Sequence, residues 1–112
     1  MNDVFYIYII SCSGGRLYTG YTSDPVKRFK EHKTGKRGAK FTRGFTPVSF
    51  EGLWEVNGSR GDAMKIEAFI KSLKRVDKTA LIDNPESLRD LLPEPVSSID
   101  VKVSCLTVVT DF

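Results

Sequence analysis

Five side chains in the first 67 residues of this 112-residue sequence have types suited to phosphate-ester hydrolysis: Tyr8, Tyr18, Arg28, His32 and Glu67. An arginine binds phosphate as a planar cation, a carboxylate holds a hard divalent ion, and tyrosine and histidine transfer protons. Arg28 and His32 are four residues apart, so they share one face if this segment is a helix. Such a set could bind a phosphodiester, neutralise the charge of its transition state and deprotonate a water molecule.

Four of these residues also have an ordinary structural explanation. Tyr8 and Tyr18 can simply pack in strands, and a lone histidine is commonly solvated. Glu67 can form a surface ion pair with Lys71, one helical turn further on. The combination of residues therefore carries more weight than any one of them.

A hairpin and a third strand are the first elements that must position these side chains. Residues 4–11 are rich in β-branched and aromatic types, and Ser13-Gly14-Gly15 supplies a turn before a returning strand at 16–22. A two-residue turn would send Tyr8 and Tyr18 to opposite faces. A three-residue turn pairs Tyr8 with Gly20 and puts both tyrosines on one face, as a shared site requires.

Helix signals follow the hairpin. Asp24 can cap a helix with Pro25 in its first turn, and this helix ends at Gly35. Residues 59–62 cap a longer helix at about 62–75, and short helical segments are expected at 77–82 and 85–92. A third strand is expected at about 48–56. The fold class is therefore α+β, with a small three-stranded antiparallel sheet flanked by helices.

Charge is distributed unevenly along the chain. Residues 1–82 hold 15 Lys/Arg against 8 Asp/Glu, and residues 83–112 hold 2 against 6. The densest basic stretch, 27–43, has eight basic residues and one acid, which favours polyanions such as DNA. No apolar run is long enough to cross a membrane, and two widely spaced cysteines indicate reduced thiols in the cytoplasm.

The order of these residues resembles the GIY-YIG nuclease superfamily. Its paired signature matches Tyr6-Ile7-Tyr8 and Tyr18-Thr19-Gly20, followed by Arg28-x-x-x-His32, Glu67 and Asn84. The segments 38–44 and Asn84-Pro85 are similar to the short, single-domain bacterial branch. Tyr6, Thr19 and Leu88 depart from the usual residues at their positions, and the resemblance spans about residues 4–92.

The resemblance implies one divalent cation, Mg²⁺ or Mn²⁺, held by Glu67 together with waters and the substrate phosphate. Arg28 would contact the scissile phosphate, and Tyr8 would take the proton of the attacking water. A free tyrosine has a pKa near 10, so Tyr8 needs either a nearby proton acceptor, for which His32 is suited, or the electric field of the metal. Tyr18 would orient water or phosphate.

Further residues would bind or position DNA. Asn84 would be a positioning residue behind the site. The expected nucleic-acid-binding residues are basic side chains of the loop and of the later helix: Lys36, Arg37, Lys40, Arg43, Lys71 and Lys74. So small a domain has little surface for reading bases, so weak sequence specificity is expected.

The sequence thus favours a metal-dependent DNA endonuclease acting in repair or recombination, as in the excision-repair and junction-cleaving nucleases it resembles. A non-catalytic nucleic-acid-binding module and a protein-interaction subunit are the alternatives. Residues 1–95 form the expected nuclease domain and 96–112 a C-terminal extension. Residues 99–109 are β-like, and apolar and polar types alternate over 99–105. This pattern predicts either a late edge strand or a tail that binds a protein partner.

Overall fold

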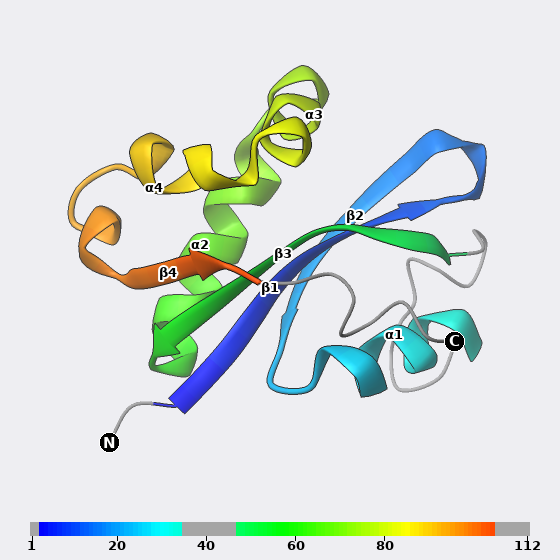
Figure 1. The fold of residues 1–112 in the computed structure, drawn as a ribbon, viewed down its shortest axis with the longest axis horizontal. Coiled ribbons are helices and arrows are strands. Elements are labelled where there is room, and N and C mark those ends of the chain that lie inside the picture. Colours follow the sequence, from blue (N-terminus) through cyan, green and yellow to red (C-terminus); the bar gives the residue numbers. More distant parts are fainter. Residues whose placement is uncertain (1–2, 35–46, 105–112) are drawn as a thin grey trace.

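The computed structural model describes residues 3–34 and 47–104. Four strands and four α-helices make up most of this part of the chain (Figure 1). In chain order the strands and α-helices are β1 Asp3–Cys12, β2 Arg16–Thr22, α1 Pro25–Thr34, β3 Pro47–Gly58, α2 Arg60–Ser72, α3 Arg75–Asp83, α4 Leu88–Leu91 and β4 Asp100–Val103. Three short 3₁₀ segments, η1 Ser13–Gly15, η3 Pro85–Ser87 and η4 Val96–Ser98, connect them.

All strand pairs are antiparallel, in the order β2-β1-β3-β4. The β1–β2 turn is the three-residue segment η1, in which Gly14 and Gly15 both have positive φ. Tyr8 consequently pairs with Gly20, and Ile10 pairs with Tyr18. The three-residue register expected for a shared site is confirmed.

The two long helices begin at the caps that the sequence predicts. An Asp24 carboxylate oxygen accepts a hydrogen bond from the Lys27 backbone amide at 3.1 Å, at the start of α1. Ser59 and Asp62 form a reciprocal capping box at the start of α2. Helix α2 ends at Ser72, three residues earlier than expected, because Leu73 is extended.

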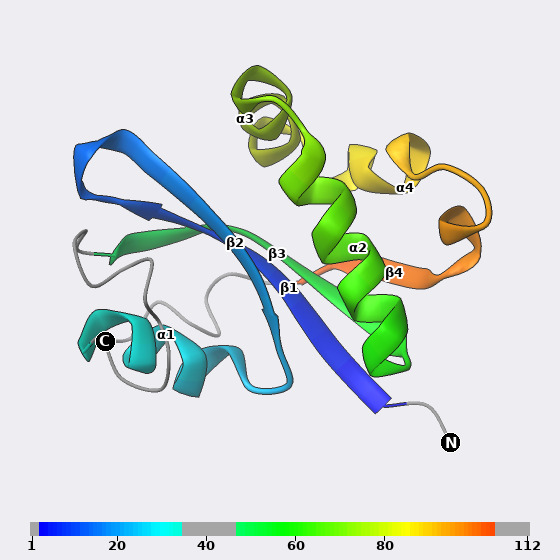
Figure 2. The ribbon, with the colours of Figure 1, turned by 180° about the vertical axis from the view of Figure 1, so that it is seen from behind.

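Helices α1 and α2 cover opposite faces of the sheet (Figures 1 and 2). Alternate residues of β1 serve the two faces, since strand side chains alternate. One cluster places Ile7 and Ile9 of β1 against Ile66 and Ile70 of α2. The other cluster joins residues of β1 and β3 to α1: Tyr8, Ile10, Cys12, Phe50, Leu53, Val26 and Phe29.

The sheet has four strands, one more than the three expected. Residues 100–103 form β4, which pairs with β3 so that Val101 lies opposite Val56. Both of these valines are buried. For residues 100–103 the structure shows the edge strand, one of the two alternatives that the sequence left, and Val101 packs in the core cluster that includes α2. Residues 105–109 of the expected segment lie outside the described residues.

Candidate active site

A cavity of about 680 Å³ opens along β2, the edge strand that runs between α1 and α2 (Figure 2). Its walls come from β1, β2, α1, α2 and the turn before α1. The lining residues are Phe5, Tyr8, Tyr18, Gly20, Tyr21, Thr22, Ser23, Asp24, Lys27, Arg28, Glu31, Arg60 and Glu67. The position of β2 at the edge of the sheet explains this lining. Helices α1 and α2 cover opposite faces of the sheet, and residues from both can line one cavity only where the sheet ends.

Tyr8 and Tyr18 form the floor of the cavity. Their ring centroids are 6.2 Å apart, and Tyr8 also contacts the Phe50 ring at 5.5 Å. The Tyr8 ring crosses the main chain of Gly20: a β-carbon at Gly20 would lie 2.6 Å from Tyr8 Cζ. A glycine at this position therefore lets Tyr8 reach across the edge strand into the cavity.

Arg28 joins α1 to this floor. Its guanidinium donates a hydrogen bond to the Tyr8 hydroxyl and another to Glu31 Oε1 at 3.1 Å. The latter is an i, i+3 ion pair on α1, with side chains 21% and 16% exposed. Arg28 is thus oriented from two sides, and its charge stands at the cavity wall.

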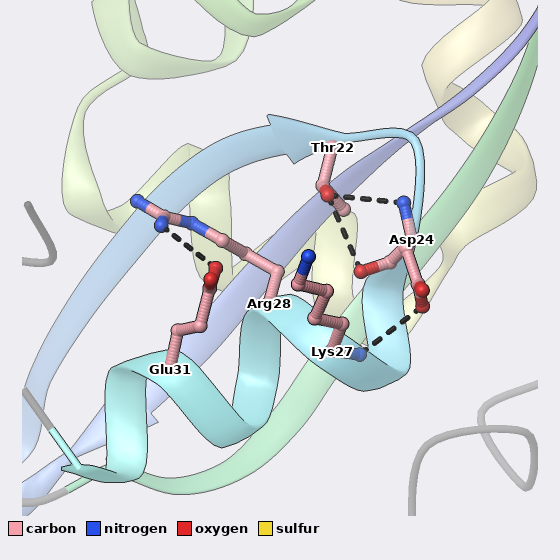
Figure 3. A network of polar contacts seen from close by, with 5 residues as sticks. All are labelled: Thr22, Asp24, Lys27, Arg28 and Glu31. Carbon is pink, nitrogen blue, oxygen red and sulfur yellow. Dashed lines mark hydrogen bonds and ion pairs between the residues drawn. The ribbon is translucent and has the colours of Figure 1, made fainter. Parts of the chain in front are cut away.

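The start of α1 is anchored to the end of β2 (Figure 3). Thr22 Oγ1 accepts a hydrogen bond from the Asp24 backbone amide at 3.1 Å, and Asp24 caps the helix. Lys27 and Arg28 extend from this first turn of α1 toward β2 (Figure 3). This short connection fixes the position of Arg28 relative to the strand that carries Tyr18 and Gly20.

Glu67 reaches the cavity from α2, beside the apolar stripe that packs on the sheet. One of its neighbours is Lys71, whose Nζ lies 3.6 Å from Glu67 Oε2. The Glu67 side chain is 17% exposed, whereas that of Lys71 is 50% exposed. Because Glu67 also acts electrostatically on Tyr8, the carboxylate and the phenol face the same space.

Burial raises the pKa of the Tyr8 hydroxyl well above its ordinary value of 10.0. The Arg28 hydrogen bond lowers this pKa in part, whereas the negative charge of Glu67 raises it further. At neutral pH the Tyr8 hydroxyl is therefore protonated. It can pass a proton on, but it does not exist as a ready-made phenolate.

Four of the residues singled out in the sequence, Tyr8, Tyr18, Arg28 and Glu67, line this one cavity. They come from β1, β2, α1 and α2 respectively. His32 belongs to α1, but its side chain lies outside the described part of the structure. The four expected loop contacts, Lys36, Arg37, Lys40 and Arg43, also lie outside the described residues.

The remaining expected residues lie away from the cavity. Asn84 is exposed at the end of α3, where its carbonyl accepts hydrogen bonds from Ser87, and it is not part of the lining. Lys71 is exposed beside Glu67. Lys74 follows the end of α2 and caps α3, so it does not share the Glu67 helix as expected.

Four charged lining residues were not among the expected site residues: Asp24, expected only as a helix cap, Lys27, expected only as part of the basic stretch 27–43, and Glu31 and Arg60. Glu31 could have been found by its i, i+3 spacing from Arg28. Arg60 could have been found because it precedes Glu67 by seven residues, which is two helical turns. Lys27 carries no such signal, since its position depends on how α1 docks against β2.

The carboxylate oxygens that line the cavity are of the ligand type that Mg²⁺ and Mn²⁺ bind. Within residues 3–34 and 47–104, no group of three or more His, Cys, Asp and Glu side chains is arranged to hold a metal. Glu67 is the carboxylate opposite the Tyr8–Arg28 pair. Mg²⁺ is commonly bound through one or two carboxylates while keeping waters and substrate phosphates, which this arrangement can supply.

The sequence matches the GIY-YIG catalytic domain family over residues 4–79. A UPF0213 protein of Haloquadratum walsbyi is 46% identical over 83 residues, which cover 74% of this chain and 91% of that protein. The UPF0213 protein of Syntrophus aciditrophicus is 44% identical over 84 residues, covering 74% and 95%. The solution NMR structure of a UPF0213 protein from Bacillus halodurans shares 37% identity, covers 84% of this chain and 90% of that one, and has a TM-score of 0.41.

No helix in the described residues has both the length and the apolar character needed to span a membrane.

Proposed function

The chain belongs to the GIY-YIG catalytic-domain family of nucleases, and from this premise we propose that it is an endonuclease hydrolysing DNA with one divalent cation. The observation that carries the proposal is the convergence of Tyr8, Tyr18, Arg28 and Glu67 on one cavity from four separate elements. We place this activity in the cytoplasm, in DNA repair or recombination, with little sequence specificity.

Glu67 holds the cation, Mg²⁺ or Mn²⁺, in this proposal. When bound, the cation supplies positive charge that stabilises the phosphate in its transition state. The ion pair with Lys71 does not compete strongly, because Lys71 is half exposed and its Nζ is 3.6 Å away. Glu67 therefore remains able to bind a cation from the cavity side.

Arg28 binds the scissile phosphate. Its planar guanidinium is held by Glu31 and by the Tyr8 hydroxyl before substrate arrives. A cation that is already oriented stabilises developing negative charge without further reorganisation. Glu31 acts through Arg28 and is a positioning residue.

Tyr8 takes the proton of the attacking water and releases its own at the same time. This relay follows from the raised pKa of Tyr8, since a free phenolate is not present at neutral pH. We assign the acceptor role to His32, one turn after Arg28 in α1. Tyr18, beside Tyr8 on the cavity floor, orients the water or the phosphate.

The test is a cleavage assay on nicked, branched, single-stranded and damaged DNA with Mg²⁺ or Mn²⁺. The wild-type protein is compared with Tyr8→Phe and with Glu67→Gln, which keeps the side-chain shape. We expect cleavage by the wild type alone, with folding and DNA binding retained by all three proteins. Binding without cleavage by the wild type would instead support the non-catalytic module.

A further inference from the structure

We propose that Arg60 binds a second phosphate of the cleaved DNA strand, within about three nucleotides of the one that is cut. This inference rests on the proposed function and specifies how the substrate strand lies in the cavity. Arg60 is the first residue of α2 and lines the same cavity as Glu67.

Arg60 and Glu67 lie on one face of α2, because seven residues make about two turns. At 1.5 Å per residue, their main chains are about 10 Å apart along the helix. Phosphates of one strand of B-form DNA rise about 3.4 Å per nucleotide, so this distance covers roughly three steps, and fewer on an extended strand. A scissile phosphate that reaches Glu67 through the proposed cation would therefore place a neighbouring phosphate near Arg60.

The guanidinium of the exposed Arg60 lies over an aromatic ring. Its Cζ lies 5.8 Å from the ring centroid of Phe5, and Phe5 is only 6% exposed. Phe5 in turn meets Tyr21 edge-on at 6.4 Å. An arginine resting on a buried ring loses less freedom when it binds an anion, since its orientation is already restricted.

The charge of Arg60 is not matched by an ion pair. Within the described ranges 3–34 and 47–104, Arg60 forms no ion pair, and each carboxylate of the lining has another partner. Glu31 pairs with Arg28, Glu67 pairs with Lys71, and Asp24 accepts a hydrogen bond from the Lys27 backbone amide. Asp62, two residues after Arg60, is engaged in the capping box with Ser59. Arg60 is therefore the cation of α2 that remains to face the cavity with its full charge.

Lys27 lies on the opposite wall of the cavity, at the end where α1 begins. The backbone amide of Lys27 serves the Asp24 cap, and its side chain extends toward β2 (Figure 3). A strand that passes from Glu67 to Arg60 thus runs between two cations. Positive charge on both sides of the path favours a polyanion over a single small anion.

The first experiment measures binding of a fluorescein-labelled single-stranded oligonucleotide by anisotropy over a range of salt concentrations, without divalent cations. Each lost phosphate contact lowers the magnitude of the slope of log K against log salt by about 0.7 for single strands. We expect this decrease in Arg60→Ala and not in Arg60→Lys, which keeps the charge. Lys65→Ala is the matched control, because Lys65 is exposed on α2 outside the cavity and is not expected to change the slope.

The second experiment places one uncharged methylphosphonate linkage at successive positions from the cleavage site. For the wild type, affinity should fall when the methylphosphonate stands at one position within about three nucleotides of the cut. For Arg60→Ala, a methylphosphonate at that same position should leave the affinity unchanged. The inference is overturned if Arg60→Ala has the same salt slope as the wild type. It is also overturned if the methylphosphonate at that position weakens binding by the same factor in Arg60→Ala as in the wild type. DNA binding with an Arg60-dependent slope but without cleavage would overturn the proposed function and leave the phosphate contact standing.

Discussion

The Tyr8 ring occupies the space that a side chain of its cross-strand partner Gly20 would need. The two residues pair directly across β1 and β2, and a β-carbon at Gly20 would lie 2.6 Å from Tyr8 Cζ. The Tyr8 side chain is 1% exposed and is packed against Phe50 and Tyr18, so it has little room to move. Gly20 thus sets where the Tyr8 hydroxyl lies in the cavity.

Gly20→Ala should therefore damage both folding and activity. The added methyl group overpacks the site, which typically costs about 1–3 kcal/mol of unfolding free energy. Displacement of the Tyr8 hydroxyl should also abolish cleavage in the protein that remains folded. Urea unfolding and a cleavage assay below the melting temperature measure the two effects separately.

Gly61→Ala is a matched control for that substitution. A β-carbon at Gly61 would meet only Ser59 Oγ, at 3.6 Å, which is an ordinary contact. We expect unchanged or slightly increased stability, by about 0.4–1 kcal/mol, since alanine restricts the unfolded chain. If Gly20→Ala and Gly61→Ala lost equal amounts of stability and activity, contact with Tyr8 would not be the cause of the loss in Gly20→Ala.

Glu67→Gln should separate activity from stability. The lost ion pair with Lys71 is largely solvent-exposed on the lysine side, so the free energy of unfolding should fall by about 0–1 kcal/mol. Cleavage should disappear because the carboxylate proposed to bind the cation is gone. Thermal melts of Glu67→Gln and Lys71→Met should agree, and full activity in Glu67→Gln would contradict the single-metal proposal.

Tyr8 should make the protein sensitive to alkali. The folded protein binds the Tyr8 proton more tightly than the unfolded chain, because burial raises the folded pKa above the ordinary 10.0. This contribution to the free energy of unfolding is fully present at pH values below the pKa of tyrosine in the unfolded chain. It is lost as the pH rises from that value through the higher pKa of Tyr8 in the folded protein. In Tyr8→Phe the free energy of unfolding should therefore decrease less as the pH is raised.

Urea unfolding at a series of pH values from neutral upward tests this expectation, with ultraviolet titration of the tyrosines beside it. The wild-type titration should contain one tyrosine whose pKa is raised well above 10.0, and that component should be missing in Tyr8→Phe. In Glu67→Gln its pKa should fall, since the negative charge of Glu67 raises it. A tyrosine titration that is the same in all three proteins would contradict the assignment.

Glu31→Ala should reduce cleavage more than it reduces stability. An i, i+3 pair contributes roughly 0.2–0.5 kcal/mol, so the fold should tolerate its loss. Arg28 would lose one of the two groups that orient it, and misplacement of such a group by about 1 Å can cost on the order of 100-fold in rate. Steady-state kinetics should show a lower kcat, partly restored in Glu31→Gln, whose amide oxygen can still accept from Arg28.

The local elements of this protein follow from its sequence. The Ser13–Gly15 turn set the strand register, the Asp24 carboxylate began α1, and the Ser59–Asp62 capping box began α2. Each of these signals acts between residues at most a few positions apart, so it can be read from the chain alone. The family and the α+β class were evident for the same reason, because they depend on motif order and periodicity.

Only the tertiary structure decided how the two helix layers meet at the cavity. Tyr8 and Glu67 belong to opposite faces of the sheet, and they converge because β2 is an edge strand with a glycine where Tyr8 must cross. The raised pKa of Tyr8 depends on burial by distant residues. The presence of Lys27 in the cavity and the pairing of β4 with β3 likewise arise from packing between distant segments, which no local pattern of residues encodes.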